Sequence, residues 1–477
     1  MSTQQIAELL TPEALRAVAP MLAISAGVLL SLLADIVPGA RAARPVLFLG
    51  SLAAAFVLQI SILADPPGLV LGGTYAATAL TGAWGLIFVA AALVAYAFGR
   101  RYYDAERPFL SEHDVLMLCA VVGMMLMAGA RDLLSFFIGL ELLSVPLYAL
   151  AGFRRADYRS VRAGMKYFLL GAFSAGLFLY GAGLAYAATG SIDLADLAQA
   201  DGALFTVGVA LMVASLFFKI SVFPFHFWVP DVYQESPTPV TTFMATGTKA
   251  AGFAFLLNAT FLLPRSALAS VAAIAILTMA IGNLGALVQS DLKRLLGFSA
   301  VAHAGTVLLV VAGTLADATL AASAARAAVY YMAAYVFTAG GAFGLIALLE
   351  SDGEHFTRVD ALRGLWRRRP GVAAAMTLFM LSLAGIPATG GFLGKWLVFA
   401  VLVDAGLVPV AVIGVLLSVV AVGYYLRVVV AMTMQPEPED QSAPTTRSLY
   451  ASLATGLCAF MVVLLGLLPG WLLGRLP

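Results

Sequence analysis

Charged residues are scarce in this sequence: only 11% of its 477 residues are Asp, Glu, Lys or Arg, whereas 62% are hydrophobic. A soluble globular domain carries about 25% charged residues and needs far less apolar surface. The composition therefore excludes an ordinary soluble enzyme and predicts a multi-pass α-helical membrane protein. The formal net charge of +1 also offers no strongly basic or acidic surface to nucleic acid or to an oppositely charged partner.

Cysteine is nearly absent, and the two that occur, Cys119 and Cys458, fall within apolar segments. We expect them to be packing residues and not a disulfide or a metal site. The sequence has no cysteine cluster for iron–sulfur ligation and no glycine-rich phosphate loop between a strand and a helix. The chain is therefore expected to bind no redox cofactor of its own.

Apolar segments long enough to cross a bilayer, about twenty residues each, follow one another along the chain. About fourteen are expected, beginning near residues 18, 45, 80, 112, 132, 163, 203, 240, 267, 296, 320, 372, 406 and 449. The loops between them are short, so no separate soluble domain is expected. The first segment lacks the basic region and cleavage site of a signal peptide and is expected to be a retained helix.

The positions of Lys and Arg test this number of segments, because these residues concentrate in the cytoplasmic loops of membrane proteins. Nineteen of the 27 lie in loops that fourteen segments would place on one side. Only five lie on the other side, namely Arg16, Arg131, Arg265, Arg326 and Arg475. The asymmetry favours fourteen segments and predicts that both termini lie in the periplasm of a bacterial cell.

Four charged residues lie inside otherwise apolar segments: Glu141, Lys219, Lys249 and Lys395. Each costs at least about 2.5–3.5 kcal/mol near the membrane centre, so such charges are rare unless they work or pair. Burial removes the hydration of an ammonium group and favours release of its proton, whereas a nearby carboxylate opposes that release. These four residues are candidates for a proton relay. The alternative is that each lysine snorkels to the membrane interface.

Two of these lysines adjoin helix-breaking sequence. Lys219 precedes the prolines of FFKISVFPFHFWVP, and Lys395 follows the glycines and proline of GIPATGGFLGKW. Non-helical backbone at membrane depth is tolerated where it lines a hydrated or protein-filled cavity, and charges at interrupted helices are typical of ion paths. His226 lies in the first break and is a further relay candidate, because imidazole titrates near neutral pH. A structural role fits His226 equally well.

Two more positions have open interpretations. Lys249 lies near the middle of its segment among small residues, which allow close helix packing or leave room for water. His303, in SAVAHAGTVLL, is a candidate relay residue, and core packing explains it equally well. A group of tyrosines could hydrogen-bond waters along a path, although aromatic packing also accounts for them: Tyr330, Tyr331, Tyr335, Tyr424 and Tyr425.

The two interrupted segments, the seventh and the twelfth, lie five segments apart. Because a shift of five helices reverses the orientation in the membrane, this placement predicts an inverted repeat of helices 4–8 against helices 9–13. The expected divisions are residues 1–110 for helices 1–3, 111–264 and 265–433 for the two repeats, and 434–477 for a flexible loop and the last helix. The predicted fold class is all-α, a polytopic bundle of about fourteen transmembrane helices.

Four longer motifs carry a resemblance to a known family: GLELLSVPLYAL, FFKISVFPFHFWVPDVYQESPTPVTTFMATGTKAAGF, IGNLGALVQSDLKRLLGFSAVAHAG and SLAGIPATGGFLGKW. With them the chain resembles, over nearly its whole length, the antiporter-like membrane subunits of respiratory complex I. The lysine of GIPATGGFLGKW and the end of the chain after the fourteenth segment are similar to the subunit N branch of that family. The resemblance implies a relay of charged residues on helices 5, 7, 8 and 12, which match Glu141, Lys219, Lys249 and Lys395.

The resemblance also implies a function. The chain would be a proton-translocating subunit in the membrane arm of an NADH:quinone oxidoreductase, a hetero-oligomer of the bacterial inner membrane. NADH, FMN, iron–sulfur clusters and quinone would be bound by partner subunits.

The resemblance further implies an order of proton transfer. Glu141 would stabilise protonated Lys219, their separation would send the proton toward Lys249, and Lys395 would be the terminal donor or acceptor. A Glu–Lys contact of about 4 Å would contribute about 4 kcal/mol at an effective dielectric near 20.

Three other interpretations stay open. A subunit of a multi-subunit cation/proton antiporter shares the fold. A stand-alone solute carrier would present a substrate pocket and work without partners. A scaffolding subunit, whose lysines only pair with neighbours, would tolerate replacement of Lys219 and Lys395.

Overall fold

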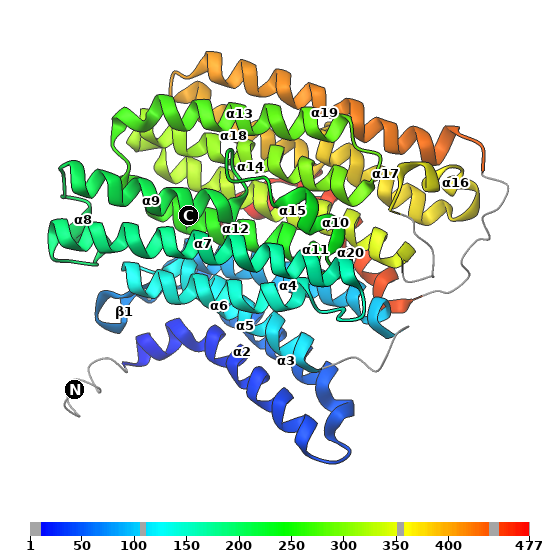
Figure 1. Cartoon of the computed structure of the whole chain (residues 1–477), viewed down its shortest axis with the longest axis horizontal. Helices are drawn as coiled ribbons and strands as arrows, with labels where there is room; N and C mark the ends of the chain where they lie inside the picture. The colour runs from blue at the N-terminus through cyan, green and yellow to red at the C-terminus, as the bar shows by residue number, and fades with distance from the viewer. Residues whose placement is uncertain (1–10, 105–110, 351–356, 438–447, 477) are drawn as a thin grey trace.

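The computed structural model describes residues 11–104, 111–350, 357–437 and 448–476. Most of them lie in long helices that run side by side, with their connections at the two ends of the bundle (Figure 1). Thirteen helices among the described residues are long and apolar enough to cross a membrane. A fourteenth crossing consists of two 15-residue helices in succession, Pro370–Ala384 and Gly390–Asp404. The predicted all-α bundle of about fourteen crossings is confirmed.

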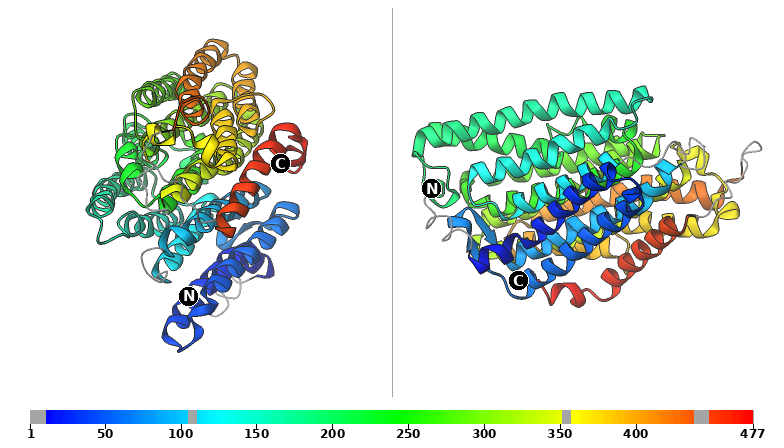
Figure 2. Two further views of the ribbon diagram at one scale, coloured as in Figure 1. Left: turned by 90° about the vertical axis from the view of Figure 1, so that its right-hand side faces the viewer. Right: turned by 90° about the horizontal axis from the view of Figure 1, so that it is seen from below.

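The first three crossings and a small hairpin form one edge of the bundle (Figure 2, left). These elements are α2 (Pro12–Ile36), α3 (Arg44–Ala64), β1 (Gly68–Val70), β2 (Tyr75–Ala77) and α4 (Ala79–Asp104). The strands pair antiparallel, with Leu69 opposite Ala76. Short 3-10 turns lie nearby and at later connections, namely η1 (Ala40–Ala43), η2 (Leu71–Gly73), η4 (Thr260–Leu262), η5 (Arg265–Ala267), η6 (Ala318–Leu320) and η7 (Val359–Leu362).

The next five crossings correspond to the first predicted repeat. They are α5 (Ser111–Gly129), α6 (Leu133–Ala151), α7 (Tyr158–Thr189), the interrupted pair α9 (Ala203–Ile220) and α10 (Val229–Glu235), and the composite helix α11 (Thr238–Phe243), η3 (Met244–Thr248) and α12 (Lys249–Asn258). The short helix α8 (Leu194–Leu197) caps the loop before α9. η3 is a turn of π-helix, a local widening that is frequent at functional sites.

The remaining crossings correspond to the second predicted repeat and the last helix. They are α13 (Leu268–Leu287), α14 (Leu292–Ala316), α15 (Ala321–Glu350), the interrupted pair α17 (Pro370–Ala384) and α18 (Gly390–Asp404), α19 (Val408–Met434) and α20 (Leu449–Leu467). Two four-residue helices, α16 (Leu365–Arg368) and α21 (Gly470–Leu473), accompany them. The breaks therefore fall in the seventh and twelfth crossings, as predicted.

Each predicted repeat begins with two helices in close backbone contact. A Cβ on Gly123 of α5 would lie 2.4 Å from the amide nitrogen of Leu143 in α6. A Cβ on Gly282 of α13 would lie 2.4 Å from the amide nitrogen of Ala302 in α14. Small residues allow this approach, which in membranes replaces hydrophobic collapse as a source of helix association. The same device at the start of both halves supports the predicted repeat.

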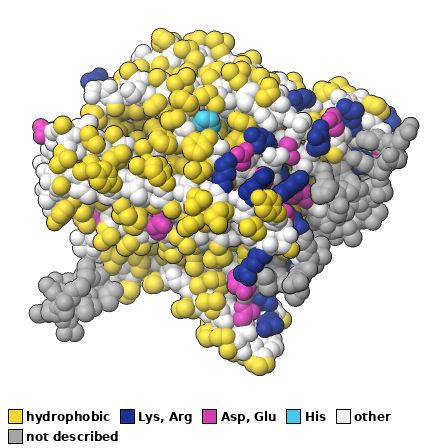
Figure 3. Space-filling model, in the orientation of Figure 1, with side chains coloured by type: hydrophobic (Ala, Val, Ile, Leu, Met, Phe, Trp, Pro, Cys, Tyr) yellow, Lys and Arg dark blue, Asp and Glu magenta, His cyan; other side chains and the backbone are white. Residues whose placement is uncertain are grey.

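Lys and Arg side chains gather at one end of the bundle, on the right in Figure 3, where α10 and α16 lie in Figure 1. Ion pairs at this end join α7 to α10 through Arg162 and Glu235, and α14 to α10 through Arg294 and Asp231. Since basic residues mark the cytoplasmic side of membrane proteins, the arrangement agrees with the side predicted from the loops.

Candidate functional site

Lys219 lies in the last turn of α9, where the seventh crossing is interrupted. Its side chain is only 3% exposed, and its ammonium donates a hydrogen bond to the hydroxyl of Ser144 in α6 at 2.6 Å. The hydroxyl of Tyr167 in α7 lies at 3.4 Å, and the Tyr148 and Tyr167 rings lie about the ammonium with centroids at 6.0 and 5.6 Å. The lysine points into the protein interior, so the alternative of snorkelling to the interface does not apply.

Glu141 does not contact Lys219 directly, which corrects the predicted contact of about 4 Å. No ion pair within 4.0 Å joins them in the part of the chain that the structure describes. Ser144, one helical turn after Glu141, accepts the lysine's hydrogen bond and donates its own proton to the carbonyl of Leu140. Glu141 is half-buried. The carboxylate therefore acts on Lys219 through space and not by a direct contact.

The break after Lys219 is held by side chains from two directions. α9 ends at Ile220, and the next residue, Ser221, has a left-handed φ of 66°. The indole of Trp228 donates to the carbonyl of Phe218 at 3.1 Å, and the amide of Phe223 donates to the hydroxyl of Thr278 in α13 at 3.1 Å. These bonds satisfy backbone groups that a continuous helix would pair, so the break is a built feature of the fold.

His226 lies in this break but away from the other candidates. Its ring packs beside Phe223, with centroids 5.8 Å apart. Among the described residues its Nδ1 has no hydrogen-bond partner. The structure thus places His226 outside the polar chain that includes Lys219, and its predicted relay role stays a prediction.

Lys249 begins α12 directly after the π-turn η3 and is 2% exposed. Its ammonium donates to the carbonyl of Ala300 in α14 at 2.5 Å. The π-turn changes the helical phase just before the lysine. Gly252, one turn later, packs on Ile220 of α9, where a Cβ would meet the isoleucine side chain at 2.4 Å. Lys249 therefore connects the last crossing of the first predicted repeat with the second crossing of the second repeat.

His303 is the centre of a buried hydrogen-bond network. It lies one turn after Ala300 on α14 and is 8% exposed. Its Nδ1 is 2.5 Å from the hydroxyl of Tyr331, and its Nε2 is 3.0 Å from the hydroxyl of Tyr425, which also bonds Ser299. His303 is therefore hydrogen-bonded on both sides of its ring, and its relay role stays a prediction. Both ring nitrogens have hydroxyl partners, so a proton arriving at one can leave from the other.

Lys395 reaches back across the second break. It lies in α18 and is 7% exposed, and its ammonium donates to the carbonyls of Leu383 and Ala384 at 2.9 and 3.0 Å. These are the last carbonyls of α17, which have no partner within their own helix and lie at the negative end of its dipole. Lys219 precedes its break, whereas Lys395 follows its break. The two ammonium groups are nevertheless both held beside the end of the first half-helix.

A small cavity of about 10 Å³ connects His303 with the surroundings of Lys395. It is roughly the size of one water molecule. Its lining combines histidine, tyrosine, threonine and serine side chains with the backbone to which Lys395 bonds: His303, Tyr331, Tyr335, Thr338, Ser382, Leu383, Gly391 and Gly394. His303 lies one turn after Ala300, whose carbonyl Lys249 bonds, and lines the same cavity as Leu383, whose carbonyl Lys395 bonds. The histidine therefore occupies a position between the two lysines.

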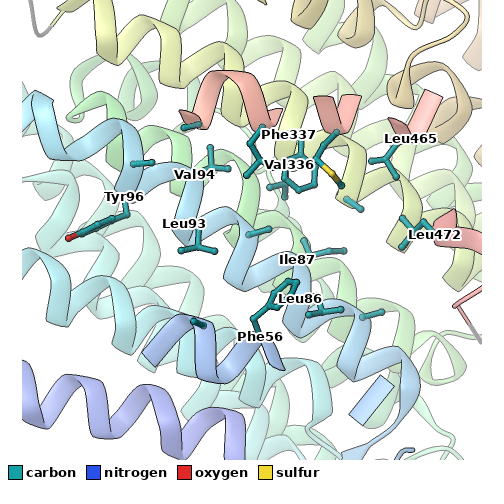
Figure 4. Close-up of a pocket in the computed structure, with 18 of the residues that line it drawn as sticks. Phe56, Leu86, Ile87, Leu93, Val94, Tyr96, Val336, Phe337, Leu465 and Leu472 are labelled. Atoms are coloured by element: carbon teal, nitrogen blue, oxygen red, sulfur yellow. The ribbon is translucent and has the colours of Figure 1, made fainter. Parts of the chain in front are cut away.

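A much larger cavity, about 870 Å³, lies elsewhere between α3, α4, α15 and α20 (Figure 4). Its walls are almost entirely apolar and include Phe56, Leu86, Leu93, Phe337 and Leu472. A solute carrier needs converging polar groups in its substrate pocket, and this cavity lacks them. In the described residues no group of three or more His, Cys, Asp and Glu side chains could hold a metal ion.

Two serines of the site were not singled out from the sequence. The hydroxyl of Ser144 accepts from Lys219, and that of Ser299 bonds the hydroxyl of Tyr425. Neither serine has a signal in the sequence, because serine is also a common small residue at helix contacts in membranes. Among the five tyrosines, Tyr331 and Tyr425 bond His303. Tyr330 instead donates to the carbonyl of Leu465 in α20, away from the site.

Known proteins share this architecture and sequence. The family described as NADH:quinone oxidoreductase/Mrp antiporter matches residues 130–421. Subunit N of NADH-quinone oxidoreductase from Salinibacter ruber is 41% identical over 449 residues, covering 90% of this chain and 89% of that protein. The chain belongs to the subunit N family of NADH-quinone oxidoreductases. Another member, from Trichlorobacter lovleyi, is 42% identical over 388 residues, 78% of each chain.

Solved structures agree with membership of the subunit N family. A chain of respiratory complex I from Thermus thermophilus, with bound aureothin, superposes with a TM-score of 0.80 at 35% identity, covering 95% of this chain and 98% of that one. A chain of the Mrp complex from Dietzia has a TM-score of 0.80 at 22% identity, covering 97% and 96%. At that identity the second likeness shows a common fold and nothing about activity.

The histidine network supports a first prediction. Replacing Tyr331 by Phe keeps the ring and removes the hydroxyl that bonds His303. The loss of one buried hydrogen bond, ~1–2 kcal/mol, should slow any transfer through the histidine about tenfold. Steady-state proton translocation by membrane vesicles measures it. Tyr330→Phe is the matched control, because its hydroxyl faces α20, and equal rates in the two variants would contradict a role for the network.

Proposed function

We propose that this chain is a proton-translocating subunit in the membrane arm of an NADH-quinone oxidoreductase. The observation that carries the proposal is the set of three buried lysines, each of which donates to an oxygen in the protein interior, with His303 between the contacts of two of them. Desolvation makes a buried ammonium a ready proton donor, and the surrounding hydroxyls and carbonyls hold it in place. This arrangement suits a relay whose members exchange protons in turn.

In the proposed relay, proton transfer begins at Lys219. When Glu141 moves closer, it favours the protonated lysine, and when it moves away it favours release. The proton passes to Lys249, from there through the His303 network, and then to Lys395 across the small cavity. At each hop one N–H or O–H bond breaks and another forms, so that the number of protons is conserved. Lys395 is the terminal donor or acceptor.

This chain supplies no redox chemistry in the proposal. NADH, FMN, iron–sulfur clusters and quinone belong to partner subunits, and electron transfer there changes the charges that act on Glu141 and Lys219. The contribution of the chain to catalysis is therefore that of a non-redox subunit of a translocase. The subunit N relatives, named after the same enzyme, support this assignment.

The proposed location is a bacterial inner membrane, with both termini in the periplasm. The gathering of Lys and Arg at one end of the bundle supports it (Figure 3), because that end would face the cytoplasm. Fourteen crossings, an even number, return the chain to the side from which it starts. Protonation would then begin from the end that carries α10 and α16.

The proposal is tested by purifying the intact assembly through a tag on this chain and reconstituting it in vesicles. We expect inhibitor-sensitive NADH:quinone reduction together with acidification that depends on it. An assembly without reductase activity that exchanges sodium for protons would instead assign the chain to the cation/proton antiporters, whose description the matched family includes. Transport of a solute by the chain alone would favour a stand-alone carrier.

A further inference from the structure

A buried ion pair lies at the basic end of the bundle, apart from the relay residues above. Lys293 occupies the first turn of α14, and its side chain is only 4% exposed although it adjoins a loop. Its ammonium donates to the carbonyl of Ser236 at 2.8 Å and lies 3.8 Å from a carboxylate oxygen of Glu350. Glu350 ends α15, is 14% exposed, and accepts a hydrogen bond from the hydroxyl of Thr238.

The burial of this pair distinguishes it from the neighbouring ion pairs. Lys166 and Asp231, at the same end, are 37% and 33% exposed. Removing two charges from water costs several kcal/mol per ion, which their attraction recovers only in part. An exposed pair could join the same helices without that penalty. The partial exposure of Glu350 also leaves its carboxylate within reach of water, whereas Lys293 is closed off.

α14 connects this pair with the relay. Lys293, Gly297 and Ala300 are spaced four and three residues apart, so they share one face of the helix. Ala300 supplies the carbonyl that Lys249 bonds. At 1.5 Å per residue, the seven residues from Lys293 to Ala300 span about 10 Å. Lys293 and the carbonyl that Lys249 bonds therefore lie on the same face of α14, about two turns apart.

Tyr233 of α10 covers the space between them. It packs over Gly297, where a Cβ would lie 3.7 Å from the Cβ of Tyr233. The phenol is completely buried, and among the described residues its hydroxyl has no hydrogen-bond partner. A buried hydroxyl without a partner is costly. Its ring packs edge-on against Trp228 and against Phe343 of α15, with centroids 5.9 and 6.0 Å away.

Two further buried hydroxyls have no hydrogen-bond partner among the described residues. They are Ser236, beside the Lys293 contact, and Thr248, beside Lys249. A bound water needs two to four polar partners, and each of these hydroxyls, unpartnered in the described residues, is free to supply one. Buried polar groups therefore occur at the Lys293 contact, at Tyr233 and at Lys249, all against or beside α14.

We infer that Glu350 and Lys293 form the proton-uptake site of this subunit, and that the Tyr233 hydroxyl connects it to the buried lysines. After Lys293 has released its proton, Glu350 takes a proton from the aqueous phase and passes it to the amine, so that a carboxylic O–H bond breaks and an ammonium N–H bond forms. Lys293 releases the proton through Tyr233, whose hydroxyl accepts one proton and donates another, to Lys249. The inference rests on the proposed function and names where its protons enter.

The test uses the intact assembly in inside-out vesicles, with protons translocated per NADH oxidised as the readout. Lys293→Arg keeps the positive charge and the ion pair, but arginine does not release its proton. Tyr233→Phe keeps the ring packing and removes only the hydroxyl. We expect each to lower the ratio about tenfold while NADH oxidation and the amount of subunit in the assembly stay at wild-type values. If Lys293→Arg does not assemble, Glu350→Gln replaces it, because the amide still accepts from Thr238.

Matched controls separate this inference from the proposed function. Lys166→Arg makes the same change in an exposed ion pair, and Tyr180→Phe does so at a phenol that is 64% exposed; both should pump normally. If Lys219→Ala stops pumping while Lys293→Arg or Tyr233→Phe pumps normally, the uptake site is wrong and the function stands. If Lys219→Ala also pumps normally, the proposed function itself fails.

Discussion

Replacing Lys219 by alanine is expected to reduce proton translocation at least about 100-fold, the scale of a lost acid–base group. The ammonium is the charged group in the last turn of α9, and its loss removes the donor that bonds the hydroxyls of Ser144 and Tyr167. Proton translocation and NADH oxidation are both measured in vesicles that contain the intact assembly. Assembly should persist, because alanine fits a helix interior and leaves no charge without its partner in a direct ion pair.

Lys219→Arg is the informative companion of this variant. It retains a cation beside Ser144 and Glu141 but does not give up its proton at any physiological pH. A subunit whose lysine only pairs with its neighbours would tolerate arginine and would suffer from alanine. A relay fails in both variants. Near-normal pumping by an assembled Lys219→Ala protein would falsify the assignment of this residue, and normal pumping by Lys219→Arg alone would favour the scaffolding interpretation.

The second large effect is expected at the glycine where α13 meets α14. In Gly282→Val, the Cβ would lie 2.4 Å from the amide nitrogen and 2.8 Å from the Cα of Ala302, and these backbone atoms cannot rotate away. Overpacking costs ~1–3 kcal/mol where side chains can adjust, and we expect the upper end or more here. The subunit should disappear from membranes, as measured by immunoblot and by the midpoint of thermal aggregation in detergent.

Gly176→Val provides the matched control for Gly282→Val. Gly176 lies on an exposed face of α7, where a Cβ meets no atom within 4 Å. The same substitution there changes helix propensity but no contact. If both valine variants accumulate equally, the close approach of α13 and α14 does not hold the second repeat together, and another contact must do so.

The sequence predicted the crossings well because hydrophobic length and the distribution of basic residues depend on the bilayer more than on tertiary packing. The breaks at Lys219 and Lys395 were also predictable, since Pro224 and the glycines before Lys395 cannot continue a helix. The division of the chain into residues 111–264 and 265–433 stays a prediction, which the paired glycines support.

The sequence could not predict which side chains meet within the bundle. Glu141 and Lys219 look like partners because they are opposite charges in neighbouring crossings, but the rotation of each helix decides whether they touch, and Ser144 takes the contact. For Lys293 the sequence suggests too much exposure. This residue stands next to Arg294 at a loop and reads as a surface residue, although its position on the inner face of α14 buries it.

Lys395 secures the end of α17 by donating to its last two carbonyls. The ammonium therefore also holds the end of this half-helix in place, and how strongly it does so depends on whether Lys395 is protonated. Binding free energies are reciprocal: a pull that draws the end of α17 away makes the ammonium a stronger acid, and loss of the proton makes the half-helix easier to move. Movement of the end of α17 and protonation of Lys395 are therefore coupled, so that work done on the helix can change the proton affinity of the lysine, and the reverse.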